Sequence, residues 1–136
     1  MNYKKLLLIS LILITSSYLS FAASSSKSLP KPGKWEVSTD FGTFNFTVNS
    51  KSDHVENVGF KLSKFKCGYV EITGGVSMKS KEFWPIKDSE FTSRLNLKVY
   101  KITINGKFDE TGEQASGTWE IYSGGQVCKG EWESKI

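Results

Sequence analysis

The sequence predicts an all-β protein: a single antiparallel β-sandwich or partly closed β-barrel of about eight or nine short strands. Three observations lead to this fold class. After residue 23, apolar and polar residues alternate with a period of two, no window has a 3.6-residue apolar period, and turn-forming residues recur at short intervals. The 136-residue chain has room for one such domain and is too short for two.

The first 22 residues have the pattern of a secretory signal peptide. Lys4 and Lys5 precede an apolar run from Leu6 to Ile14, and Ser20-Phe21-Ala22 places small residues at the two positions that a signal peptidase reads. The run is too short to span a bilayer comfortably, which disfavours a membrane anchor. We therefore expect export with cleavage, no stable membrane span afterwards, and a secreted, periplasmic or cell-surface location.

Residues 23–34 are predicted to be a flexible, disordered linker before the β-domain of residues 35–136. The first half of this linker is rich in serine, and Pro30 and Pro32 stiffen the second half. Removal of Lys4 and Lys5 with the leader lowers the formal net charge from +4 to +2. So mild a positive charge predicts no nucleic-acid partner.

Strands are predicted in the first half of the domain from about residues 35, 43, 58 and 70. Residues 40–42 form a turn signal between the first two. The alternation slips between Leu62 and Phe65, which predicts a β-bulge or a bend at Ser63-Lys64. Gly74-Gly75 then breaks the chain.

The second half begins with an irregular segment, residues 79–88, where Pro85 makes a central strand unfavourable. Residues 90–99 read as a strand with Leu97 and Val99 inward, followed by a tight turn or a bulge near Tyr100. Residues 102–121 read as an antiparallel hairpin whose turn, residues 109–113, contains a glycine able to take a positive φ. A last strand covers residues 127–133.

Large aromatic residues dominate the predicted core, which contains Trp35, Phe44, Phe46, Phe60, Phe108, Trp119 and Trp132. The chain has two cysteines, Cys67 and Cys128. Export would place them in an oxidising compartment, where an even pair normally forms a disulfide. Two free thiols, or half of a metal site, are the alternatives.

The order of short motifs resembles a group of uncharacterised secreted bacterial β-domains. The motifs are Gly33-x-Trp35, Phe44-Asn45-Phe46-Thr47-Val48, Val58-x-Phe60, Cys67, Ile86-x-x-Ser89-x-Phe91, Ile104-x-Gly106-x-Phe108, Ala115-Ser116-Gly117-Thr118-Trp119 and Cys128-x-Gly130-x-Trp132. The resemblance implies the same architecture and paired cysteines, and it implies no catalytic residue. This chain is richer in lysine than the Ser/Thr/Gly-rich surfaces of that group.

The sequence offers little catalytic or metal-binding chemistry. His54 is the only histidine, no Gly-x-Ser-x-Gly elbow is present, and the neighbouring Asp53 is expected to point away from it in an exposed loop. A zinc set of Cys67, Cys128 and His54 lacks the close ligand spacing that builds such sites. We expect no metal and no other cofactor.

Acidic residues on the predicted strands leave one enzymatic alternative, a small secreted hydrolase. Such an enzyme needs two carboxylates that face each other across a groove. The available acids are Glu71, Asp109, Glu120, Glu131 and Glu133. All but Asp109 point outward among other polar residues, as on an ordinary solvated sheet.

Four aromatic residues are the candidate ligand-binding residues. Tyr69 and Tyr122 fall on outward faces, and Phe83 and Trp84 lie in the irregular segment. Exposed aromatic rings could stack on a sugar or hold a protein partner; alternatively, Phe83 and Trp84 cap one end of the core. The sequence therefore predicts an exported, non-catalytic binding module for a carbohydrate or another cell-surface ligand. The alternatives are the hydrolase and a protein-binding inhibitor or effector.

Overall fold

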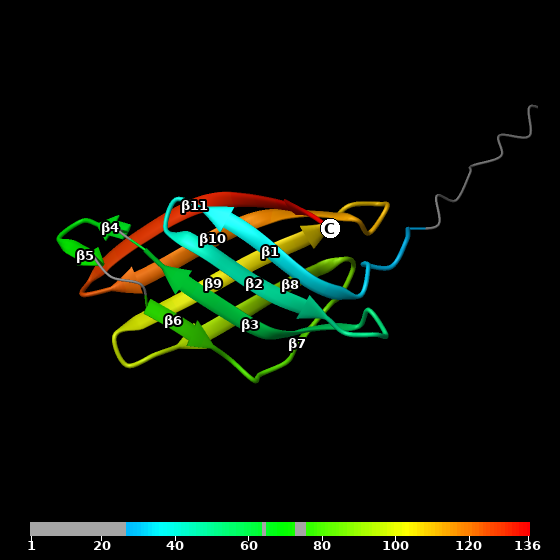
Figure 1. The fold of residues 1–136 in the computed structure, drawn as a ribbon, viewed down its shortest axis with the longest axis horizontal. Coiled ribbons are helices and arrows are strands. Elements are labelled where there is room, and N and C mark those ends of the chain that lie inside the picture. Colours follow the sequence, from blue (N-terminus) through cyan, green and yellow to red (C-terminus); the bar gives the residue numbers. More distant parts are fainter. Residues whose placement is uncertain (1–26, 64, 73–75) are drawn as a thin grey trace, which may run out of the picture.

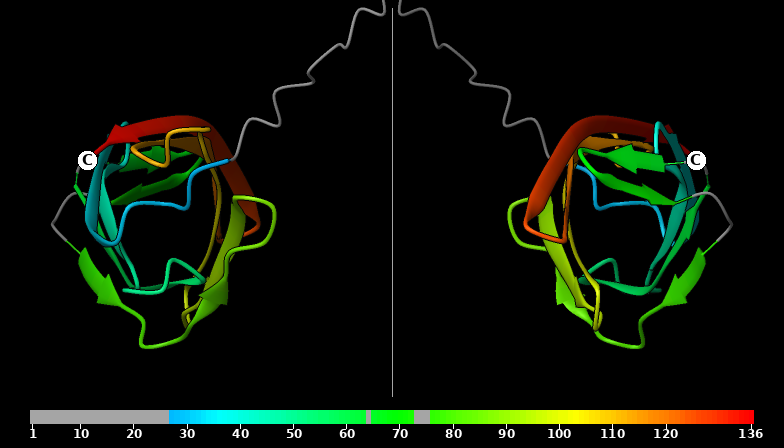
Figure 2. Two further views of the ribbon diagram at one scale, coloured as in Figure 1. Left: turned by 90° about the vertical axis from the view of Figure 1, so that its right-hand side faces the viewer. Right: turned by 90° about the vertical axis from the view of Figure 1, so that its left-hand side faces the viewer.

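The computed structural model describes residues 27–63, 65–72 and 76–136, and this part of the chain is all-β. Its strands are antiparallel and form two main sheets that are not closed into a barrel, as in a β-sandwich. Figures 1 and 2 show the two layers curving around a shared interior. The predicted fold class is confirmed. The described residues contain eleven strands rather than eight or nine, because three of them have only two or three residues.

The first sheet contains five strands. β1 (Gly33–Thr39), β2 (Gly42–Val48), β3 (His54–Leu62) and β6 (Val76–Lys79) lie in that order, and β7 (Trp84–Pro85) pairs with the start of β3. Pro85 therefore lies at a sheet edge, where its missing N–H leaves no gap in the ladder.

A bulge in β3 was not predicted. Asn45 pairs with Gly59 and Thr47 with Glu56, so Asn57 and Val58 together oppose the single residue Phe46. Asn57 has a positive φ of 53°, which the bulge requires and asparagine tolerates. The bulge keeps both Val58 and the earlier Val55 in the core. The predicted bulge position, Ser63-Lys64, includes Lys64, which lies outside the described residues.

The second sheet contains β8 (Glu90–Asn96), β9 (Tyr100–Phe108), β10 (Gln114–Ser123) and β11 (Gln126–Lys135) in the order β11-β10-β9-β8. The predicted hairpin is confirmed, and Gly112 in its turn has a φ of 72°. A tight turn joins β8 to β9, closed by a 2.8 Å hydrogen bond from the Leu97 N–H to the Tyr100 carbonyl. The inward position predicted for Val99 is wrong, since this turn leaves it 65% exposed.

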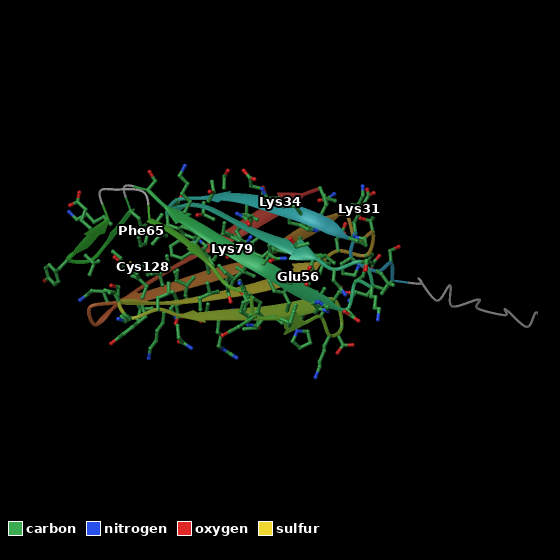
Figure 3. All side chains as sticks on the ribbon, turned by 60° about the horizontal axis from the view of Figure 1, so that its bottom comes forward. Lys31, Lys34, Glu56, Phe65, Lys79 and Cys128 are labelled. Carbon is green, nitrogen blue, oxygen red and sulfur yellow. A yellow bond between two sulfur atoms is a disulfide. The ribbon has the colours of Figure 1, made fainter. Side chains whose placement is uncertain are left out.

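A short hairpin of β4 (Phe65–Cys67) and β5 (Val70–Ile72) is tied to the second sheet by the Cys67–Cys128 disulfide. The two Cα atoms are 5.8 Å apart, and the predicted disulfide is confirmed. Figure 3 shows Phe65 and Cys128 toward this end of the molecule, away from Lys31 and Glu56.

Aromatic rings from both sheets interlock in the core, and all seven predicted core aromatics are buried. The ring centroids of Phe44 and Trp132 are 5.2 Å apart, and those of Trp35 and Phe108 are 5.4 Å apart. Phe41 also lies in the core with no exposed surface, although it stands in a turn. Its ring meets that of Trp119 edge-on at 5.0 Å, so this turn closes one end of the sandwich.

Two inward glycines make room for these rings. A Cβ at Gly106 would lie 2.2 Å from a ring carbon of Phe91, and a Cβ at Gly130 would lie 2.5 Å from the indole of Trp119. The aromatic side chains cover the glycine backbone and supply the packing that the glycines lack. The Gly-x-Phe and Gly-x-Trp motifs are therefore packing motifs.

The structure places part of the predicted linker, residues 27–32, in contact with the β-domain, and residues 33 and 34 of that linker begin β1. The Lys31 N–H donates to the Gly112 carbonyl at 2.8 Å, and the Ser52 hydroxyl donates to the carbonyl of the buried Pro30 at 2.6 Å. These contacts hold the segment against two loops, the one between β9 and β10 and the one between β2 and β3. The predicted signal peptide, linker residues 23–26 and Gly74-Gly75 lie outside the described residues.

Candidate ligand-binding surface

The four candidate aromatics lie in three different environments. Tyr69 is 95% exposed, Tyr122 is 42% exposed and Phe83 is 66% exposed, whereas Trp84 is only 8% exposed. Trp84 belongs to the core because β7 pairs it with Val55 at the edge of the first sheet. The expectation of a surface role for Trp84 is therefore wrong, and its alternative, a cap on the core, describes this residue.

The exposed aromatics are also divided between two ends of the molecule. Phe83 packs edge-on against His54, the first residue of β3, with ring centroids 5.1 Å apart. Tyr69 lies in the turn between β4 and β5, beyond the other end of β3. Figure 1 shows β7 well separated from β4 and β5 along the long axis. The structure thus does not bring Phe83 together with the two tyrosines.

Tyr69 is held on a well-anchored turn. Gly68 and Tyr69 are the two turn residues between paired Cys67 and Val70, and Gly68 has a φ of 59°, as the first position of a type II′ hairpin turn needs. The disulfide fixes one side of this turn. A Cβ on Gly68 would lie 2.6 Å from the Gln126 side chain, which shows how closely the hairpin meets the β10–β11 turn.

The β10–β11 turn brings further exposed apolar groups to the same end. Tyr122 pairs across this hairpin with Val127, which is 48% exposed. Val99 stands in the adjacent β8–β9 turn, because Tyr100 pairs with Ser123. This end of the molecule, which we call the tyrosine end, is defined by Tyr69, Val99, Tyr122 and Val127.

The outer face of the second sheet consists of four cross-strand rows, read from β8 to β11. They are Asn96–Lys101–Tyr122–Val127, Arg94–Thr103–Glu120–Lys129, Thr92–Asn105–Thr118–Glu131 and Glu90–Lys107–Ser116–Glu133. The first row lies at the tyrosine end, and the register places each row about 7 Å from the next. The outer face thus continues directly from the tyrosine end.

Ion pairs compensate some of the charges on this outer face. Glu90 binds Lys107 at 3.0 Å, and Glu120 binds Lys129 at 2.9 Å. Arg94 and Lys101 have no carboxylate partner among the residues that the structure describes. The Lys101 ammonium instead lies 5.8 Å from the ring centroid of Tyr122.

A hollow of about 320 Å³ collects these groups. It is lined by Arg94, Asn96, Lys101, Ile102, Thr103, Glu120 and Tyr122. Neither Arg94 nor Lys101 was among the site residues predicted from the sequence. Arg94 nevertheless stood out in the sequence, because it is the only arginine among the 18 basic residues and stands at an outward strand position.

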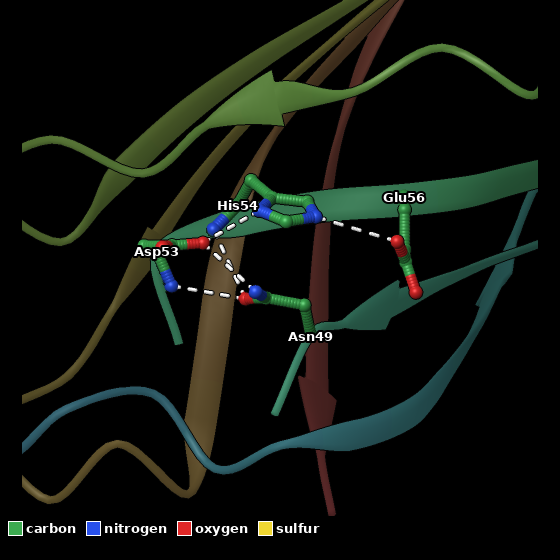
Figure 4. A network of polar contacts seen from close by, with 4 residues as sticks. All are labelled: Asn49, Asp53, His54 and Glu56. Atoms are coloured by element: carbon green, nitrogen blue, oxygen red, sulfur yellow. Dashed lines mark hydrogen bonds and ion pairs between the residues drawn. The ribbon is translucent and has the colours of Figure 1, made fainter. Parts of the chain in front are cut away.

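A polar network surrounds His54 at the start of β3, away from the tyrosine end (Figure 4). One ring nitrogen contacts the Asp53 carboxylate, and the other lies 3.3 Å from Glu56. The Asn49 side chain donates to Asp53 at 2.8 Å and accepts the Asp53 backbone N–H at 3.0 Å. The expectation that Asp53 points away from His54 is wrong, because Asn49 folds the loop and turns the carboxylate toward the ring.

Two carboxyl groups have shifted pKa values. The pKa of Asp53 is lowered, mainly by its hydrogen bond with His54, against a smaller opposing effect of desolvation. For Asp109, desolvation raises the pKa, but hydrogen bonds from Thr111 and from three backbone N–H groups outweigh it, so the pKa is lowered. Both shifts favour the ionised carboxylate, which has no proton to donate as a general acid near neutral pH.

Carboxylates also line two hollows beside β11. One, of about 620 Å³, is lined by Asp40, Glu131 and Glu133 among other residues; the other, of about 540 Å³, includes Asp109 and Glu133. Asp40, Glu131 and Glu133 are exposed. A glycosidase needs one carboxyl group that burial keeps protonated, and these exposed acids lack that environment.

Within residues 27–63, 65–72 and 76–136, no group of three or more His, Cys, Asp or Glu side chains is placed to hold a metal ion. The same part of the chain contains no helix long and apolar enough to cross a membrane. Both cysteine sulfurs are used in the disulfide.

Comparison of the chain with protein-family models, with curated proteins and with solved structures found no match.

Proposed function

We propose that the protein is an exported, non-catalytic binding module that holds a carbohydrate or another cell-surface ligand at its tyrosine end. The observation that carries this proposal is the position of Tyr69 and Tyr122. Both rings are exposed, and the elements that bear them are packed against each other and fixed by the Cys67–Cys128 disulfide.

Exposed aromatics on anchored hairpins suit ligand binding, because the backbone that carries them is already ordered before a sugar ring stacks on them. Neither tyrosine is needed to fill the core, which the buried aromatics already occupy. The disulfide itself is typical of proteins in an oxidising, extracellular or periplasmic environment. Together with the signal peptide predicted at residues 1–22, the disulfide supports the proposal of export.

The hydrolase alternative has weaker support. Its carboxylates are exposed or have a lowered pKa, and neither condition favours a general acid. The alternative of a protein-binding inhibitor or effector would use the same exposed apolar groups. Ligand identity therefore separates this alternative from carbohydrate binding.

The test is a glycan array, with neutral and acidic polysaccharides, probed with the wild type and a Tyr69→Ala/Tyr122→Ala variant. Loss of two aromatic contacts, each of roughly 1 kcal/mol, should weaken binding about tenfold or more. The melting temperature should stay close to that of the wild type, because both side chains are exposed.

Phe83→Ala is the matched control, since it removes an exposed aromatic ring from the other end of the molecule. It should leave glycan binding unchanged. Equal losses in the control and the double variant would refute a binding site at the tyrosine end, and no binding to any glycan would refute a carbohydrate ligand. A protein partner that binds the wild type but not the double variant, with no glycan bound, would favour the inhibitor or effector alternative.

A further inference from the structure

The hollow beside Tyr122 on the outer face of the second sheet has a chemical composition that narrows the ligand class. Arg94 and Lys101 carry two positive charges into it. Glu120 is its one acidic lining residue, and the 2.9 Å ion pair with Lys129 offsets that charge. The described residues around the hollow therefore leave a local positive charge beside an aromatic ring.

Arg94 differs chemically from the other basic residues of the protein. The other 17 basic residues of the sequence are lysines, and the single arginine faces this hollow from β8. A guanidinium group offers a planar pair of N–H donors that matches a carboxylate, whereas a lysine ammonium acts as a point charge. Arg94 is therefore chemically suited to bind a planar anion.

The remaining lining residues suit a hydroxyl-rich molecule. Asn96 and Thr103 can each donate and accept hydrogen bonds, and Tyr122 remains 42% exposed. The volume of about 320 Å³ lies at the small end of the range for ligand sites, roughly 300–1,000 Å³. The hollow opens on a sheet face, so a polymer can continue past it across the strands.

We propose that this hollow binds an acidic saccharide, a carboxylate-bearing hexuronate unit of a polysaccharide. Arg94 and Lys101 bind the carboxylate, Tyr122 contacts the sugar ring, and Asn96 and Thr103 bind its hydroxyl groups. This inference rests on the proposed function and specifies its ligand. It requires that removal of the carboxylate charge from the same polymer abolishes most of the binding.

The experiment measures binding of the purified protein to polygalacturonate, alginate and hyaluronate by calorimetric titration at 0.15 M salt. Fully methyl-esterified polygalacturonate has the same ring backbone with the charge removed, and a neutral glucan is a further arm. We expect binding to at least one uronate and about tenfold weaker binding to the ester. Arg94→Gln should weaken uronate binding about tenfold, since it removes charge-assisted hydrogen bonds.

Lys61→Gln is the matched control, because Lys61 is an exposed cation on β3 of the other sheet and its replacement changes the net charge equally. It should change uronate binding less than twofold. Thermal melts of both variants verify that the fold is retained.

Several outcomes overturn the inference. Equal losses in Arg94→Gln and Lys61→Gln would show a non-specific charge effect. Equal affinity for polygalacturonate and its methyl ester would show that the carboxylate is not recognised; in that case the proposed carbohydrate-binding function still stands. Binding to inorganic phosphate or to anionic phosphatidylglycerol vesicles in place of the uronates would assign the hollow to a different ligand. Absence of binding to all three uronates refutes the inference. If the methyl ester and the neutral glucan do not bind either, the carbohydrate ligand of the proposed function is refuted as well.

Discussion

The Cys67–Cys128 disulfide should contribute strongly to stability. Cys67 and Cys128 are 61 residues apart in the sequence. Closing a loop of that size removes unfolded-state entropy equivalent to about 4 kcal/mol at 25 °C. A domain of about 110 residues unfolds with an entropy of about 0.23 kcal/mol per kelvin. Loss of the disulfide should therefore lower the melting temperature by about 15–20 °C.

The assay is thermal unfolding of the wild type and of a Cys67→Ser/Cys128→Ser variant, monitored by tryptophan fluorescence and by far-ultraviolet circular dichroism. At temperatures below its own melting transition, the variant should keep the β-sheet spectrum. Inter-strand hydrogen bonds and the aromatic core hold both main sheets without the disulfide. A decrease of less than about 5 °C would refute the reasoning, since it would mean that the cross-link barely restricts the unfolded chain.

Three further predictions use single substitutions. Trp84→Ala should cost about 3 kcal/mol in the free energy of unfolding, whereas the neighbouring, exposed Phe83→Ala should cost less than about 1 kcal/mol in urea denaturation. Ser93 is fully buried, and its hydroxyl has no hydrogen-bond partner among the described residues, so Ser93→Ala should stabilise by about 1 kcal/mol while the outward Ser116→Ala changes little. The pKa of Asp53 is lower in the folded state than in the unfolded state. Its contribution to the free energy of unfolding is therefore fully present above the unfolded pKa near 3.8 and is lost as the pH falls through the folded pKa. The melting temperature of Asp53→Asn should therefore fall less than that of the wild type between about pH 4 and pH 2.

The sheets were predictable wherever a strict two-residue alternation continued between clear turns. The hairpin of β9 and β10 is the best example, because its inward residues, its turn and the positive φ of Gly112 all follow from the local sequence. Phe41 was not predictable in this way. A turn signal surrounds it, and only the tertiary fold shows that the turn bends over the end of the core and buries the ring.

The sequence did not predict the bulge in β3 and wrongly placed Val99 inward, for a related reason. Asn57 interrupts the alternation without a glycine or proline to mark the position, so the pairing partner in β2 is needed to detect the extra residue. Val99 continues an inward pattern in the sequence, but the tight turn that begins at Leu97 takes it out of the strand.

The candidate site was predictable only in part. The inward–outward alternation along the strands placed Tyr69 and Tyr122 on outward faces, and both are exposed in the structure. Trp84 could not be placed in this way, because its segment has no two-residue alternation. Its burial depends on pairing with Val55, which comes from another part of the chain. Arg94 stood out in the sequence by composition alone, and its relation to Lys101 and Tyr122 required the strand register.

Arg94 and Lys101 have no carboxylate partner among the residues that the structure describes, and this absence is consistent with the proposed anion site. On the same face, Glu90 pairs with Lys107 and Glu120 with Lys129, so acidic residues at cross-strand positions do compensate cations on this sheet. Asn96, an uncharged residue, stands opposite Lys101 on the same strand face as Arg94. A glutamate there would add a cross-strand ion pair of roughly 0.3–1 kcal/mol, so stability alone would favour it.

Replacing Asn96 with glutamate therefore separates the two explanations. Asn96→Glu should raise the free energy of unfolding slightly, by up to about 0.5 kcal/mol, because the new carboxylate meets Lys101 and lies near Arg94. The same carboxylate occupies the position of the ligand anion and repels it, so uronate binding should fall about tenfold or more, while Asn96→Gln retains it. A glutamate variant that is more stable and binds uronates as tightly as the wild type would contradict the assignment of Arg94 and Lys101 to ligand binding.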